Sequence, residues 1–208
     1  MKQIGFWFDP ISPFAYLAFE RLPEALEGCT YAVEYRPLLF AGLLAQWGQK
    51  GPAEIEPKRQ WTFRHVAWMA HQWGIPLQTP ATHPFNPLPL LRLVVAAGAN
   101  RRTVEPVMRH VWRSGGAEAL DAARLDALAR ELKPARDPAS VEVKAELRAA
   151  TDAAIARGLF GVPTFELDGR LFWGVDALPM LRAALLGDPW FDGPAWDAAG
   201  APRPGVRR

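Results

Sequence analysis

Cysteine is almost absent from this chain, because Cys29 is the only one among 208 residues. A single cysteine excludes an intrachain disulfide, a CxxC redox centre and a cysteine-rich metal site. It also predicts a cytoplasmic protein, since disulfides belong to oxidising compartments. Cys29 follows Gly28 at the expected end of a helix, and we expect it to be chemically inert.

An excess of one charge and long apolar runs are also missing. The 24 Lys and Arg residues nearly balance the 22 Asp and Glu residues, for a net charge of +2. This balance gives no electrostatic case for binding nucleic acid or a membrane surface. The longest apolar runs, such as residues 88–98, are too short to span a bilayer. The first residues resemble a strand more than a secretory signal.

Half of the residues are hydrophobic, which supports a folded domain with a sizeable core. Residues 4–8 predict a short buried strand, and residues 30–39 alternate as a second strand. Between them, Ser12-Pro13 predicts a helix start, because Ser is a favoured N-cap and Pro suits the first helical position.

The remaining chain predicts a helical block followed by a hairpin and a last helix. Helical periodicity occurs near residues 57–74, 86–98, 103–114, 121–132 and 140–157. Asp168-Gly169 separates two apolar segments and predicts a type I′ hairpin turn. We then expect Asp176 to be the N-cap of a helix that continues to Leu186.

The element order is therefore βαβ, then helices, then ββα, which predicts an α/β fold with one four-stranded sheet. We expect residues 1–40 and 158–187 to form the sheet domain and residues 41–157 to form a helical insertion with its own partial core. Residues 188–208, rich in Pro, Gly and Arg, are expected to be a mobile tail. Three aromatic residues there leave two alternatives, packing on the domain or on a partner subunit: Trp190, Phe191 and Trp196.

Two distant segments carry the candidate chemistry. Ser12 lies in a strand-to-helix turn, where free backbone N–H groups stabilise an anion by roughly 0.3–1 kcal/mol, or up to about 2 when partly buried. The alternative is that Ser12 is only an N-cap. Pro163 follows Gly-Val at a strand entrance, where it cannot donate to the sheet. Either a cis peptide at Val162–Pro163 or a trans Pro opening an edge strand explains this position.

Residues 8–18, FDPISPFAYLA, and residues 158–181, GLFGVPTFELDGRLFWGVDALPML, together resemble the 2-hydroxychromene-2-carboxylate isomerase family. Residues 48–55, GQKGPAEI, and residues 83–88, HPFNPL, fit the same family. It is a DsbA-like, thioredoxin-fold group related to kappa-class glutathione transferases. The resemblance implies a thioredoxin-like domain with a large all-helical insertion, and a cis peptide before Pro163.

The resemblance also implies an activity. Relatives with redox function carry CxxC where this chain has Ser12-Pro13-Phe14-Ala15, so dithiol exchange is chemically unavailable here. In glutathione-dependent relatives, a hydroxyl at the position of Ser12 donates a hydrogen bond to the bound thiolate, which is the nucleophile. The implied reaction interconverts a chromene carboxylate and trans-o-hydroxybenzylidenepyruvate in aromatic catabolism, with glutathione as cofactor. The oligomeric state stays open, and a homodimer is one alternative.

The family pattern assigns further site residues. Its glutathione-binding positions correspond to Ser12, Val162, Pro163, Trp173, Gly174, Val175 and Asp176. The glutathione backbone would pair with Val162 as a short added strand, and the Gly174 turn with Asp176 would hold the γ-glutamyl end. The alternative for Asp176 is a plain N-cap, and both roles are compatible.

The substrate side would come from the helical block, at Lys50, Glu54, His83 and Asn86. Lys50 is a candidate partner for a substrate carboxylate, or else an exposed loop lysine. Asn86 matches a family asparagine near the substrate or glutathione. Glu54 departs from a family asparagine, and an ionised carboxylate cannot donate a hydrogen bond. His83 is a candidate acid or base, or a structural residue before proline.

Two other function classes remain open at this stage. A kappa-like glutathione transferase or peroxidase would consume glutathione stoichiometrically. A non-catalytic glutathione- or peptide-binding module would bind without turnover, and Ser12→Ala would then change neither a rate nor a thiol pKa.

Overall fold

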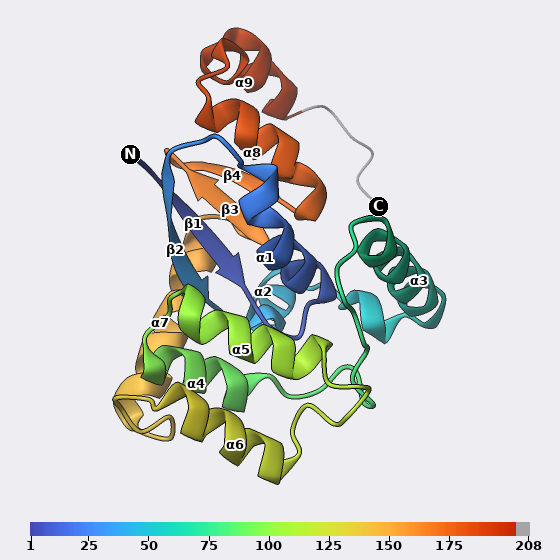
Figure 1. Ribbon diagram of the computed structural model, residues 1–208. Helices are drawn as coiled ribbons and strands as arrows, with labels where there is room; N and C mark the ends of the chain where they lie inside the picture. The colour runs from blue at the N-terminus through green and yellow to red at the C-terminus, as the bar shows by residue number, and fades with distance from the viewer. Residues whose placement is uncertain (203–208) are drawn as a thin grey trace.

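The computed structural model describes residues 1–202 and contains one mixed four-stranded sheet (Figure 1). The strands are β1 (Lys2–Phe8), β2 (Tyr31–Pro37), β3 (Thr164–Leu167) and β4 (Arg170–Trp173), in the order β2-β1-β3-β4. β1 pairs in parallel with β2 and antiparallel with β3, and β3 pairs antiparallel with β4. This is the predicted α/β arrangement, and the fold class is confirmed.

Helices cover both faces of this sheet because its central strand is apolar on both sides. Ile4, Phe6 and Phe8 are buried on one face, which α1 (Pro13–Ala25) and α8 (Leu178–Leu185) cover. Trp7 points to the other face, where it packs with residues of α2 (Phe40–Trp47) and α7 (Val141–Ala156).

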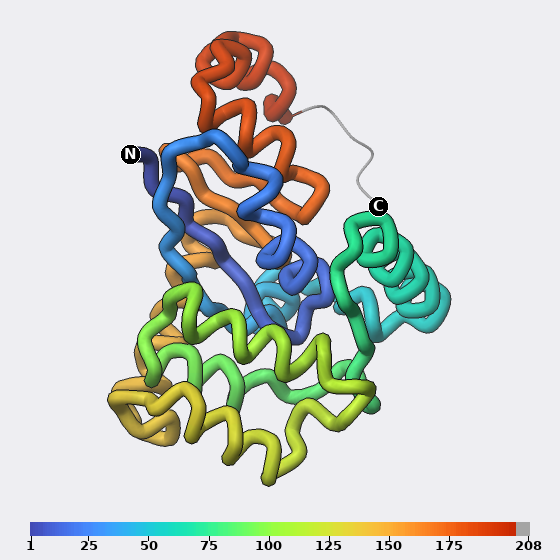
Figure 2. The backbone as a smooth tube through the Cα atoms, in the orientation of Figure 1, coloured from blue at the N-terminus to red at the C-terminus, as the bar shows by residue number. Residues whose placement is uncertain are grey.

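Most of the inserted helices gather at the carboxyl end of β1 (Figure 2). The inserted helices include the 3₁₀ helix η1 (Pro52–Glu54) and the α-helices α3 (Glu56–Gln72), α4 (Leu88–Ala97), α5 (Arg101–Trp112) and α6 (Ala122–Leu132). Their core is mostly continuous with that of the sheet, since Val66, Val94 and Trp112 pack in the same buried cluster as Phe6. Within residues 1–202, none of the helices is long and apolar enough to cross a membrane.

The hairpin prediction is confirmed, because Asp168 and Gly169 both have positive φ, 51° and 78°. The prediction that Asp176 caps the last helix is wrong. Asp176 lies inside a 3₁₀ turn, η2 (Val175–Ala177), and the N-cap of α8 is Ala177.

Residues 188–202, part of the expected tail, contain two short helices. They form η3 (Pro189–Asp192) and α9 (Pro194–Gly200), and Asp188 caps η3 through the Trp190 N–H. Phe191 is buried against Phe172 of β4, so packing on the domain is the alternative that the structure shows. The rest of the expected tail, residues 203–208, lies outside the described residues.

Candidate functional site

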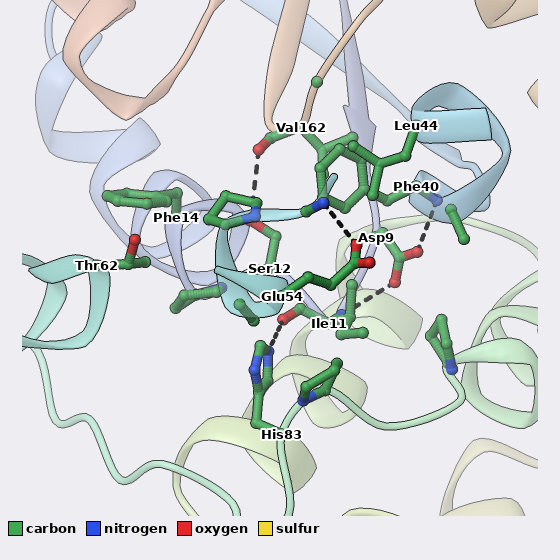
Figure 3. Close-up of a pocket in the computed structure, with 18 of the residues that line it drawn as sticks. Asp9, Ile11, Ser12, Phe14, Phe40, Leu44, Glu54, Thr62, His83 and Val162 are labelled. Carbon is green, nitrogen blue, oxygen red and sulfur yellow. Dashed lines mark hydrogen bonds between the residues drawn. The ribbon is translucent and has the colours of Figure 1, made fainter. Parts of the chain in front are cut away.

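A cavity of about 720 Å³ lies where the carboxyl end of β1 meets the inserted helices (Figure 3). Segments far apart in sequence line it: the β1–α1 turn, the start of α2, the loop into α3, the loop before α4 and the residues before β3. Seven predicted site residues line this cavity: Ser12, Lys50, Glu54, His83, Asn86, Val162 and Trp173. The other four are not among the lining residues and follow on the same segments: Pro163, Gly174, Val175 and Asp176.

Ser12 is both a cap and a cavity residue. It is the N-cap of α1, where its Oγ accepts a hydrogen bond from the Ala15 N–H at 3.2 Å. The same hydroxyl donates to the carbonyl oxygen of Val162 at 3.4 Å, a long and therefore weak hydrogen bond. The side chain is 7% exposed. The Ser12 hydroxyl thus donates its single proton to a distant chain segment. The hydrogen bond is weak enough for another acceptor to take the place of the Val162 carbonyl.

The Val162–Pro163 peptide is cis, as the family resemblance implies. The Pro163 carbonyl accepts from the Gly174 N–H at 2.9 Å, which joins this segment to the turn after β4. The Val162 N–H makes no hydrogen bond to the described residues 1–202, so a backbone donor and a weakly bound carbonyl stand side by side next to Ser12.

Two glycines, one before β3 and one after β4, let side chains lie directly against the backbone. A Cβ on Gly161 would stand 2.4 Å from Trp173 Nε1, so only glycine lets the indole lie over this backbone. A Cβ on Gly174, which has a φ of 96°, would stand 2.2 Å from a carboxylate oxygen of Asp176. The Asp176 carboxylate therefore lies close to the Gly174 backbone. Asp176 is also exposed to solvent.

Asp9 is the site residue that the sequence analysis missed. Its side chain is fully buried and lines the cavity. One carboxylate oxygen accepts from the Ile11 N–H at 3.0 Å and the other from the Phe40 N–H at 2.9 Å (Figure 3). Burial raises the pKa of Asp9 from 3.8 to about 7, against the lowering effect of these two hydrogen bonds. The signal was available, because a carboxylate directly after a buried strand seldom lies inside without a role.

Three cations line the cavity: Lys50, Lys58 and Arg59. None of them forms an ion pair with another residue in the range 1–202. Glu54 lies close by, but one of its carboxylate oxygens accepts from the Gly51 N–H at 2.6 Å and closes η1. The Glu54 side chain therefore supports the loop itself, and three positive charges remain for an anionic ligand.

His83 lies in the loop before α4. Its peptide bond to Pro84 is a second cis peptide, which the sequence analysis did not predict. Its Nε2 lies 2.9 Å from the Ile11 carbonyl, which can only accept, so Nε2 carries the proton. Nδ1 is buried and has no partner among residues 1–202, and burial lowers the pKa of His83 below its ordinary value. This arrangement favours the structural interpretation: a neutral imidazole that fastens the loop to the Ser12 turn.

Asn86 lines the cavity and lies two residues before the start of α4. The N-cap of α4 is Pro87, although Asn86 Oδ1 still accepts from the Leu88 N–H at 3.1 Å. Apolar walls surround these polar groups, and the aromatic lining residues are Phe14, Phe40, Phe63, Phe85, Phe160 and Trp173. Residues 1–202 contain no group of three or more His, Cys, Asp or Glu that could hold a metal ion.

Comparisons with known proteins agree with this geometry. A family model described as a DSBA-like thioredoxin domain matches residues 3–186. The chain is 32% identical over 193 residues to a 2-hydroxychromene-2-carboxylate isomerase of Pseudomonas putida, covering 88% of this chain and 93% of that protein. It is 29% identical over 216 residues to glutathione S-transferase kappa 2 of Caenorhabditis elegans, covering 93% and 95%. A solved structure of a 2-hydroxychromene-2-carboxylate isomerase matches with a TM-score of 0.78 at 25% identity, covering 96% of this chain and 100% of that one.

Proposed function

This chain belongs to the DSBA-like thioredoxin domain family, among the 2-hydroxychromene-2-carboxylate isomerases, and we propose that it is a glutathione-dependent isomerase. The proposed reaction interconverts 2-hydroxychromene-2-carboxylate and trans-o-hydroxybenzylidenepyruvate. The observation that carries the proposal is the Ser12 hydroxyl, which caps α1, lines the cavity and meets the Val162 carbonyl across 150 residues of sequence.

The residues present fit a bound glutathione. The Val162 N–H is without a protein partner among residues 1–202, and its carbonyl holds only the 3.4 Å bond from Ser12. An extended peptide can pair with both groups as a short added strand. Asp176 and the Gly174 turn lie next to this segment and suit the ammonium of the γ-glutamyl end.

Pairing of glutathione with Val162 would also free the Ser12 hydroxyl to donate a hydrogen bond to the sulfur atom. A hydroxyl has one proton, and in this structure Ser12 donates it to the Val162 carbonyl. When a ligand N–H takes over that carbonyl, the Ser12 hydroxyl can turn its proton to a sulfur atom at the start of α1. A hydrogen bond and the helix dipole at this position both favour a thiolate.

Glutathione, when bound, would supply the thiolate that attacks the substrate and is regenerated at the end. The chain would hold the flat substrate between the aromatic walls and its carboxylate at Lys50, with Lys58 and Arg59 nearby. Isomerisation needs no net oxidation, which suits a chain whose only cysteine, Cys29, lies outside the cavity lining.

A kappa-like transferase or peroxidase is the second candidate, favoured by the similarity to the kappa-class protein of Caenorhabditis elegans. The two candidates differ in stoichiometry, because a transferase consumes one glutathione per product. A glutathione- or peptide-binding module without turnover is the third.

Calorimetry with glutathione, combined with a spectrophotometric assay of ring opening, tests the proposal. We expect binding below millimolar concentrations, turnover of the chromene acid, and no loss of glutathione during turnover. Asp176→Ala should weaken binding, whereas Asp188→Ala, which removes the cap of η3, should not. Wild-type protein that fails to bind glutathione at millimolar concentration would falsify the proposal.

A further inference from the structure

Asp9 is a buried acid that the proposed reaction does not use, and it lies inside the site. Its main-chain carbonyl accepts from the Ser12 N–H at 3.0 Å, which closes a four-residue turn. The Cα atoms of such a turn lie within about 7 Å of each other. Both residues are buried and line the same cavity, so the Asp9 carboxyl group and an anion held at Ser12 would share one buried environment.

The carboxyl group also joins two walls of the cavity. The N-cap of α2, Leu39, provides no side-chain hydrogen bond, and the Asp9 carboxylate accepts from the first helical N–H, that of Phe40, instead. Its other oxygen holds the Ile11 N–H in the turn that leads to Ser12. An ionised Asp9 thus fixes α2 to the Ser12 turn through two backbone amides.

We propose that Asp9 is a positioning residue of this site: its carboxyl group and the anion held at Ser12 share one negative charge, so that Asp9 takes up a proton as a thiolate forms. This inference rests on the proposed function for its ligand. Two negative charges close together in a buried site disfavour each other, so one of them is neutralised.

The proton balance is simple. The thiol loses its proton, the Asp9 carboxylate gains one through solvent, and the net charge of the site does not change. The pKa of Asp9, which burial raises to about 7, allows both of its forms near neutral pH. Other charged or titratable groups line the same cavity on the neighbouring elements, and each variant below retains them: Lys50, Glu54, Lys58, Arg59 and His83.

A thiol built into the protein tests this inference without glutathione. In a Cys29→Ala background, Ser12→Cys places the only thiol of the chain at the start of α1. The rate of its alkylation by iodoacetamide is measured from pH 5 to pH 9. We expect a profile broader than one ionisation, because the thiol and Asp9 titrate together.

Adding Asp9→Asn should lower the thiol pKa by about one unit and leave a single ionisation, since a like charge is removed. The matched control is Asp168→Asn, which removes a carboxylate from the hairpin turn at the opposite end of β1 and should change nothing. An equal thiol pKa with Asp9 and with Asn at position 9 would overturn the inference.

If the Asp9→Asn protein does not fold, the parent profile decides alone, because a single ionisation there contradicts the shared charge. The outcome is separate from that of the proposed function. Wild-type protein that fails to bind glutathione overturns the proposed function, whereas the alkylation profile reports only on Asp9 and its neighbour.

Discussion

Helices α1 and α7 begin in the same way, with a serine whose hydroxyl accepts from the amide three residues on. The distance is 3.2 Å from Ser12 to Ala15 and 3.3 Å from Ser140 to Val143. The surroundings differ, because Ser12 also reaches the Val162 carbonyl and lines a cavity, whereas Ser140 caps a helix outside that lining. The comparison shows that the local cap is common to both helix starts and that the contact with a distant segment distinguishes Ser12.

Removing the two hydroxyls separately sharpens this comparison. Each change to alanine should cost about 1 kcal/mol of stability, because each removes an N-cap. Ser12→Ala should in addition lower kcat for chromene ring opening by about 100-fold, the effect of losing one donor to a developing anion. Ser140→Ala should leave kcat unchanged, and equal losses of kcat in the two variants would contradict the assignment.

Two glycines with positive φ extend the comparison to the glutathione end of the site. Gly174 has a φ of 96°, and an added Cβ would collide with Asp176, whereas Gly187 has a φ of 82° and open space around it. Alanine strains the backbone at both positions. Only Gly174→Ala should displace the Asp176 carboxylate, raising the Kd for glutathione by about 10-fold in calorimetry. A similar rise for Gly187→Ala would show that backbone strain alone is responsible.

Lys50 provides the corresponding test at the substrate end. Lys50→Ala should raise KM for the chromene acid about five-fold and leave kcat within a factor of two, because it removes binding shared by ground and transition states. Lys144→Ala on the exposed face of α7 is the control of equal charge. A change confined to kcat would remove Lys50 from substrate binding.

Asp9 and Asp168, at opposite ends of β1, extend the comparison from activity to the pH dependence of stability. The folded protein retains the Asp9 proton up to about pH 7, while an unfolded chain loses it near pH 3.8. Asp9 therefore lowers stability as the pH rises from about 4 to about 7. The Tm of Asp9→Asn relative to wild type should rise across this range by about 10 °C, since one pKa unit corresponds to about 1.4 kcal/mol. For Asp168→Asn the difference should be flat, and a flat difference for Asp9→Asn would refute this account of its ionisation.

Local signals in the sequence predicted much of the fold. The Ser12-Pro13 start, the Asp168-Gly169 turn and the cis peptide before Pro163 depend on neighbouring residues or on a motif, and the structure confirms all three. The last helix was misplaced because a 3₁₀ turn separates Asp176 from α8. Pro179, in the first turn of α8, was the better marker of its start.

Contacts between distant segments were beyond a reading of the sequence alone. Asp9 gave no local signal of its bond to Phe40, which is 31 residues away. The hydrogen bonds of His83 to the Ile11 carbonyl and of Glu54 to the Gly51 N–H show supporting roles that residue type alone left open. The two short helices within residues 188–202 were not predicted, because Pro and Gly there mark helix starts and caps.

Ultraviolet absorbance of the thiolate near 240 nm, in protein titrated with glutathione at pH 7, tests the central claim most directly. If Ser12 and the start of α1 hold the sulfur ionised, wild-type protein should show a saturable rise that Ser12→Ala abolishes and Ser140→Ala retains. Glutathione that binds with the same absorbance to all three proteins, or binds only as the thiol, would contradict the account.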